Sequence, residues 1–242
     1  IAKYLNYLLT IPLFFLLGIL YYHIIMIVHE LVHFTFVPSV KLNNFLGNIL
    51  SPLIGLNFQS YREIHFNHHK AKTIESDPDA YIYAPVLKEK KWYKRIAIFL
   101  VGSIFELFIK MKVKSLSNKG NFFNRYSVII AQLILLLTFS IFSNPYNYFI
   151  FWLLPIITIG LFLNRLRVLI EHGYEFREKL NHNPQKTVNV KCNFLEKIIF
   201  APHNFNYHKE HHDFPGIPYY QLPEVYKTRK KSIKEEHSYI AM

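Results

Sequence analysis

Histidine is the residue type that stands out in this sequence, with 13 in 242 positions, and most of them fall in three short clusters. The clusters read HELVH, with His29 and His33; HFNHH, with His65, His68 and His69; and HKEHH, with His208, His211 and His212. Residues at i, i+3 and i+4 share one face of a helix, so each cluster predicts an arc of imidazoles directed at one point. Neutral imidazole binds Fe, Zn, Cu and Ni, so this pattern indicates metal binding.

The number of clustered histidines limits how many metal ions can explain them. A tetrahedral zinc site takes four ligands, so eight clustered imidazoles are too many for one zinc ion and enough for two metal ions. The first cluster alone matches HExxH, the pattern in which Glu30 would be the general base of a zinc protease. That interpretation leaves the other two clusters unexplained.

The remaining histidines divide by their surroundings. His172, in RVLIEHG, follows an apolar segment and is expected at the depth where the clusters meet, so it is predicted as a ninth ligand. His23, His182 and His237 have no partner at ligand spacing, and we expect ordinary structural roles for them. His203 is compatible with either role.

Two long stretches without Asp, Glu, Lys or Arg predict membrane-spanning helices. The first covers residues 4–29, which would extend roughly 39 Å as a helix, more than the ~30 Å of a bilayer core. The second covers residues 126–164 and contains SNPYN at 143–147, which predicts a turn between two antiparallel helices. Lys and Arg flank the ends of this hairpin but not its turn, so both ends are expected to face the cytoplasm.

Two shorter apolar segments, residues 42–61 and 96–109, contain polar interruptions and are expected at the membrane interface. All three clusters then lie on one side of the membrane. The predicted fold class is an all-α membrane protein, whose transmembrane helices carry a cytoplasmic helical cap holding the histidine cluster. Residues 1–242 are expected to form a single integral-membrane domain, and the initial Ile1 suggests a truncated N-terminus.

Net charge and cysteine content exclude some classes of binding partner and cofactor. The net charge is +12, but the basic residues lie in clumps between uncharged runs instead of along one basic helix, so no nucleic-acid partner is expected. The single cysteine, Cys192, excludes an internal disulfide and a thiolate metal cluster.

The order of the clusters resembles that of the membrane fatty acid desaturase family, whose members carry HxxxH, HxxHH and HxxHH boxes around a transmembrane hairpin. The resemblance covers nearly the whole chain, and PHNFNYHKEHHDFPGIPYYQLP at 202–223 is similar to the C-terminal box of sphingolipid and bacterial acyl-lipid desaturases. It implies a di-iron centre of two Fe ions with no catalytic residue beyond the metal centre. The ligands implied are His29, His33, His65, His68, His69, His172, His208, His211 and His212.

The activity implied by the resemblance is O₂-dependent introduction of a double bond into the acyl chain of a fatty acid or membrane lipid. The electron donor is expected to be external, of the ferredoxin or cytochrome b5 type, because the sequence contains no haem-binding module, cysteine quartet or GxGxxG fingerprint. The enzyme is expected to be a multi-pass integral membrane protein with its active site on the cytoplasmic side.

Three alternatives stay open at this point. The nearest keeps the same metals but inserts oxygen, as carotenoid ketolases and hydroxylases or membrane alkane hydroxylases do. Two others come from different classes: an intramembrane zinc protease built on HELVH, and a non-enzymatic metal-binding or transport protein.

Polar neighbours of the clusters are expected to orient the imidazole rings through their second N–H groups. The candidates are Glu30, Glu171, Glu210, Asp213 and Asn67. The segment ESDPDAY at 75–81, just after the second cluster, also resembles the family's pattern. A turn rich in Asp and Pro needs no functional explanation, so its residues are left out of the predicted metal site.

Overall fold

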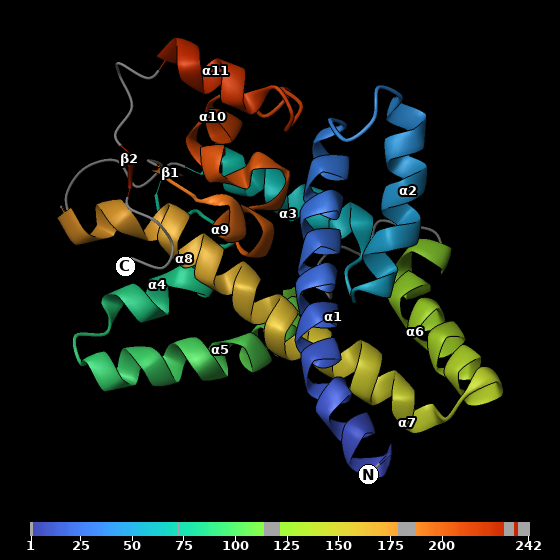
Figure 1. The fold of residues 1–242 in the computed structure, drawn as a ribbon. Coiled ribbons are helices and arrows are strands. Elements are labelled where there is room, and N and C mark those ends of the chain that lie inside the picture. Colours follow the sequence, from blue (N-terminus) through green and yellow to red (C-terminus); the bar gives the residue numbers. More distant parts are fainter. Residues whose placement is uncertain (1, 72, 114–121, 179–186, 230–234, 237–242) are drawn as a thin grey trace.

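The computed structural model describes residues 2–71, 73–113, 122–178, 187–229 and 235–236, and this part of the chain is mostly helical (Figure 1). Each of the three histidine clusters lies on a helix, as their spacing predicts. The elements are α1 (Ala2–His33), α2 (Val40–Leu53), α3 (Phe58–Lys70), α4 (Ala80–Lys88), α5 (Trp92–Val113), α6 (Phe122–Phe142), α7 (Pro145–Tyr148), η1 (Phe149–Leu153), η2 (Ile156–Gly160), α8 (Leu161–Glu178), β1 (Asn189–Val190), α9 (Phe194–Ile199), η3 (Pro202–Tyr207), α10 (His208–Asp213), α11 (Leu222–Arg229) and β2 (Glu235–Glu236).

Helix α1 is apolar throughout, but its two halves have different surroundings. Near its start Leu8 and Leu9 are 67% and 62% exposed, whereas Tyr22 and Met26 further along are completely buried. The stretch Leu8–His33 is long and apolar enough to cross a membrane. An exposed apolar half suits contact with lipid, and a buried half suits a core that holds the first histidine cluster.

The predicted helical hairpin is present, with its turn at Ser143 and Asn144. Asn144 accepts a hydrogen bond from the Tyr146 amide at 2.9 Å and so starts the second arm. That arm is helical from Pro145 through α8, and Pro145–His172 is also long and apolar enough to cross a membrane.

Pro155 in the second arm leaves a backbone carbonyl available for a hydrogen bond from α1. Pro155 has no N–H, so the carbonyl of Phe151, four residues earlier, loses its usual helical partner. The hydroxyl of Tyr21 on α1 donates to that carbonyl at 2.6 Å. The helix is π-helical on either side, at η1 and η2, which is a common adjustment where the regular hydrogen-bond ladder is disturbed.

The predicted apolar segment 42–61 comprises α2 and the start of α3. α2 has 14 residues, which extend about 21 Å and cannot cross a ~30 Å bilayer core. The carbonyls at its C-terminal end, of Pro52 and Leu53, accept hydrogen bonds from the Gln132 amide, and that of Leu53 also accepts from the Trp152 indole at 3.1 Å. Side chains of the hairpin therefore satisfy the helix end, and the chain turns at Gly55, whose φ is +80°, into α3.

The other predicted segment, 96–109, lies inside the longer α5. α4 and α5 form a helical pair packed against α8, and α5 runs across the direction of α1 (Figure 1). Trp92, Tyr93 and Ile96 at the start of α5 are 72%, 52% and 50% exposed. Exposed aromatic and aliphatic side chains beside lysines are typical of a helix at a membrane interface.

The C-terminal elements α9, η3, α10 and α11 gather over the end of α1 that carries His29 and His33 (Figure 1). α9 starts with a capping box between Asn193 and Glu196. The buried carboxylate of Glu210 accepts from the Asn189 side chain at 2.7 Å, which joins α10 to β1. These contacts hold the third histidine cluster over the first.

Candidate metal centre

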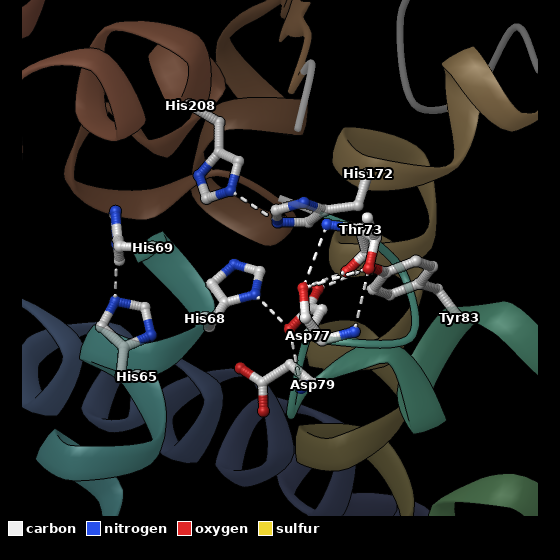
Figure 2. Close-up of polar contacts among 10 residues, drawn as sticks. His65, His68, His69, Thr73, Asp77, Asp79, Tyr83, His172 and His208 are labelled. Carbon is white, nitrogen blue, oxygen red and sulfur yellow. Dashed lines mark hydrogen bonds and ion pairs between the residues drawn. The ribbon is translucent and has the colours of Figure 1, made fainter. Parts of the chain in front are cut away.

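Four helices bring the nine predicted histidines to one place. α1 supplies His29 and His33, α3 supplies three, α8 supplies His172 and α10 supplies three. Figure 2 shows imidazoles of α3, α8 and α10 facing one another across the site. His29 and His211, 182 residues apart in sequence, thus meet at the end of α1, because the hairpin returns the chain to it.

The imidazoles form two groups. In the first group each residue offers one nitrogen, and these nitrogens lie within 4.8 Å of one another; its members are His29, His33, His65, His69 and His211. The second group meets the same criterion and consists of His68, His172 and His212. His208 adjoins the second group, with its Nε2 at 2.9 Å from Nε2 of His172 (Figure 2).

The spacing of the nitrogens fits a coordination shell. Nε2 of His65 lies 2.8 Å from Nε2 of His33 and 3.0 Å from Nε2 of His69. Two ligands at about 2.1 Å from one ion and 90° apart would be separated by roughly 3 Å. The distances therefore match neighbouring ligands of one ion.

Several ring nitrogens are buried without a hydrogen-bond partner in the described part of the chain. They include both nitrogens of His29 and the Nε2 atoms of His211 and His212. Buried polar atoms in folded proteins are nearly always satisfied. Nitrogens directed at one point and lacking donors or acceptors fit a bound metal ion.

The protonation state of most of the rings also suits metal binding. Burial, reinforced by neighbouring imidazoles, lowers the pKa of His65, His208, His211 and His212 well below the usual value. Burial lowers the pKa of His69 to about 2, with smaller effects from His33 and His68. These rings are neutral at pH 7 and keep the lone pair that a metal ion requires.

His68 differs from the other rings. Burial alone would lower its pKa, but its hydrogen bond to Asp77 and the charges of Asp79 and Asp77 outweigh burial and raise it. Its Nδ1 lies 2.8 Å from Oδ1 of Asp77, and both side chains are buried, at 6% and 7% exposed. A metal ion at Nε2 of His68 therefore competes with a proton.

Of the polar residues predicted to orient the imidazole rings, two lie beside a histidine of the groups and three do not. Glu171 accepts from Arg167 at 2.6 Å and lies 3.4 Å from Nδ1 of His208, so it borders the second group. Glu30 lies 3.5 Å from Nδ1 of His29. Glu210 contacts Asn189, Asp213 pairs with Arg229 at 2.9 Å, and Asn67 is exposed, so these three serve other parts of the surface or fold.

Asp77 and Tyr83 are the residues that sequence reasoning missed. The segment at 75–81 does form a turn, in which the Asp79 amide donates to Asp77 at 2.8 Å, but the same carboxylate also contacts His68. The interpretation as a turn was thus incomplete. The available signal was a pair of aspartates soon after the second cluster, and its meaning depended on how α3 and α4 pack.

The isolated histidines stay outside both groups where the structure describes them. Nε2 of His23 lies 2.6 Å from the Ile198 carbonyl, and the ring of His203 packs edge-on against Tyr219. His23 and His203 therefore lie apart from both groups. His182 and His237 lie outside the described residues.

The number of imidazoles in the first group does not suit a zinc protease. His29 and His33 share their group with three further imidazoles, more ligands than a catalytic zinc site uses. Oε2 of Glu30 accepts from the Thr35 hydroxyl at 2.7 Å, whereas its Oε1 has no hydrogen-bond partner in the described part of the chain. It is therefore the ligand number, and not Glu30, that disfavours a protease.

Comparison with known proteins identifies fatty acid desaturases as relatives of this chain. The sequence profile of the fatty acid desaturase family matches residues 6–241. An endoplasmic-reticulum omega-3 fatty acid desaturase of Nicotiana tabacum is 26% identical over 273 positions, covering 95% of this chain and 67% of the relative. An sn-1 oleoyl-lipid 12-desaturase of Picosynechococcus sp. is 27% identical, covering 93% of this chain and 70% of the relative.

A third relative, an acyl-lipid omega-3 desaturase (cytochrome b5) of the Arabidopsis thaliana endoplasmic reticulum, is 24% identical and covers 88% of this chain and 61% of its own length. The family profile spans nearly all of the sequence, including the three clusters and His172. On this evidence the chain belongs to the fatty acid desaturase family.

Proposed function

We propose that this oxidoreductase introduces a double bond into the acyl chain of a fatty acid or membrane lipid, using O₂ and external electrons. The reaction removes one hydrogen atom from each of two neighbouring carbons. These two hydrogen atoms, two protons and two electrons convert O₂ to two water molecules, so atoms and charges balance. Family membership supports desaturation, and the convergence of the nine histidines is the structural observation that carries the proposal.

We propose that two iron ions are held by all nine histidines. Five imidazoles of the first group would bind one ion, and His68, His172 and His212 with the adjoining His208 would bind the other. The bound irons would supply the reductive activation of O₂ needed to break an unactivated C–H bond. The imidazoles are neutral donors, and carboxylates border the groups without belonging to either.

The chain's own contribution is to orient the rings and to exclude water. Arg167 neutralises Glu171 beside His208, and its guanidinium lies 5.1 Å from the ring centre of Phe205. Phe205 is 2% exposed and its ring lies 4.6 Å from that of His29. An apolar wall against the first group suits the passage of a hydrocarbon chain.

The proposed location is integral to a membrane, with the metal centre on the cytoplasmic side. The two apolar spans end at His33 and His172, so both would deliver ligands at the same membrane face. The lysines and arginines around the hairpin ends favour the cytoplasm for that face. We further propose that residues 1–242 act as one domain with α5 in the interface. One core of buried residues joins α1 to η2, α8 and η3, and a smaller core packs α4 against the same α8.

The substrate and the donor follow from the same reasoning. The relatives named above act on fatty acids or acyl lipids, and the name of the Arabidopsis relative includes cytochrome b5. We propose an acyl lipid as substrate and a ferredoxin or cytochrome b5-type protein as donor. Lys209 on α10 and Lys227 on α11 each pair with a carboxylate of their own helix, so it is the net charge of +12 that favours an acidic donor.

Product analysis tests the proposed function. Cells expressing the chain are supplied with a defined lipid mixture under isotopically labelled O₂, and their lipids are analysed by mass spectrometry. We expect products that have lost two hydrogen atoms and contain no labelled oxygen. A product that carries labelled oxygen would instead identify an oxygen-inserting enzyme of the ketolase or hydroxylase type, and cells with an empty vector provide the baseline.

A further inference from the structure

Asp77 contacts a histidine of the second group on the side away from the proposed metal. Its Oδ1 lies 2.8 Å from Nδ1 of His68, and the pair is almost fully buried (Figure 2). A carboxylate only accepts hydrogen bonds, so Nδ1 of His68 carries a hydrogen atom. The other nitrogen, Nε2, is then the one available to a metal ion.

The carboxylate of Asp77 is itself held in place. The Asp79 amide donates to Oδ1 at 2.8 Å, and the Tyr83 hydroxyl donates to Oδ2 at 2.5 Å. Tyr83 is 3% exposed. Both oxygens therefore have fixed donors, and the carboxylate has little freedom to turn away from His68.

Tyr83 also contacts a second member of the group. Its ring stacks on that of His172, with centroids 5.7 Å apart and an angle of 15° between the planes. Asp77 and Tyr83, from the turn before α4 and from α4 itself, thus adjoin two of the three histidines in the second group. A cavity of about 20 Å³, enough for roughly one water molecule, lies beside them and is lined by Thr73 and Thr187 among others.

The first group is arranged differently. Its short contacts are between imidazoles, such as His33 with His65 and His65 with His69. In the described part of the chain, Oε1 of Glu30 lies 3.5 Å from Nδ1 of His29, and neither atom makes a hydrogen bond, while Oε2 of Glu30 accepts from Thr35. Loss of Asp77 should therefore affect the two groups unequally.

We propose that Asp77 is a positioning residue that directs Nε2 of His68 toward the second metal position, and that Tyr83 locks Asp77 in that role. This inference rests on the proposed two-metal centre. It goes further by assigning a selective function to residues outside the ligand set: the Asp77–Tyr83 pair sets the affinity of one metal position and leaves the other unchanged.

Anaerobic titration of the metal-free protein with Co²⁺ or Fe²⁺ tests the inference, with bound metal and the visible spectrum of Co²⁺ as readouts. Wild-type protein is expected to bind two ions. Asp77→Asn keeps an oxygen acceptor for the turn but removes the charge, so we expect about 10-fold weaker binding of one ion. Asp77→Ala should weaken that ion by about 100-fold, since loss of such outer partners typically costs 10- to 100-fold in affinity.

Two further variants refine the result. Tyr83→Phe keeps the ring on His172 and removes only the hydroxyl, so it should weaken the same ion by less than Asp77→Asn does. Glu75→Gln is the matched control, because Glu75 is an exposed acid two residues before Asp77, and it should bind both ions as wild type does.

Three results would overturn the inference. Normal binding of both ions by Asp77→Ala would show that the contact has no positioning role. Equal weakening of both ions, with a lower melting temperature in every Asp77 variant, would show that Asp77 only supports the fold. Wild-type protein that binds neither ion would contradict the proposed metal centre as well, which separates that failure from the failure of the positioning role.

Discussion

His211 belongs to the first group, although it comes from the last cluster in the sequence. Its ring centroid is 4.6 Å from those of His29 and His33 and 5.0 Å from that of His69, and the residue is 2% exposed. These ring contacts bring α10 against α1, and Nε2 of His211 has no hydrogen-bond partner in the described part of the chain. Each proposed ligand histidine of this kind is expected to be needed for metal binding and hence for desaturation.

Replacing His211 by alanine should therefore abolish desaturation. The variant removes a proposed ligand, so we expect a loss greater than the roughly 10- to 100-fold that accompanies loss of an outer partner. Lipid analysis of expressing cells measures the product, and membrane fractionation checks that the chain still inserts. His23→Ala serves as the matched control, because His23 contacts a backbone carbonyl instead of the groups. Product formation by His211→Ala at the His23→Ala level would exclude His211 as a ligand.

At the scale of elements, the packing of α2 against α3 decides where the second cluster lies. Phe58, the first residue of α3, is 1% exposed and packs directly on Gly47 of α2. A Cβ built at Gly47 would lie 2.1 Å from the Phe58 ring. α3 can approach α2 this closely only because glycine has no side chain.

We expect Gly47→Ala to destabilise the protein and reduce its metal content. Alanine favours a helix by about 1 kcal/mol over glycine, but overpacking a filled core costs typically 1–3 kcal/mol, and a buried ring has little room to move. Thermal unfolding in detergent and metal analysis of the purified protein measure the two effects.

Two further variants separate the clash from other causes. Gly216→Ala places a methyl group where no atom lies within 4 Å, so it should leave the melting temperature unchanged. Adding Phe58→Leu to Gly47→Ala should restore part of the loss, because the smaller side chain makes room for the methyl group. An unchanged melting temperature in Gly47→Ala alone would show that α3 shifts freely at this contact.

For the whole molecule, the main issue is how the two apolar spans sit in the membrane. Leu8–His33 and Pro145–His172 both end at the histidine groups, and the hairpin turn lies at the far end of the second span. Tyr146 in that turn is 71% exposed, and so is Glu224 on α11 near the cap. These two positions should face opposite sides of the membrane.

Cysteine labelling checks this arrangement. In a Cys192→Ser background, Glu224→Cys should react with an impermeant maleimide added from the cytoplasmic side, and Tyr146→Cys should react only from the other side. Product formation by both variants shows that the fold is intact. Labelling of both cysteines from the same side would rule out the proposed crossing.

Features that depend on neighbours along the chain could be predicted from the amino-acid sequence. Spacings of three and four residues place His65, His68 and His69 on one helical face, and hydropathy without charge marks the spans, because both are local properties of the backbone and its side chains. The hairpin turn at 143–147 was predictable for the same reason, from Pro145 and its flanking asparagines.

Features that depend on contacts between distant segments could be seen only in the folded structure. The division of the histidines into groups of five and three, the contact of Asp77 with His68 and the early end of α2 at the side chains of Gln132 and Trp152 all join elements far apart in sequence. Periodicity reports which face a side chain occupies but not which other element packs on that face. The packing of whole helices therefore assigned each imidazole to its group and gave Asp77 its partner.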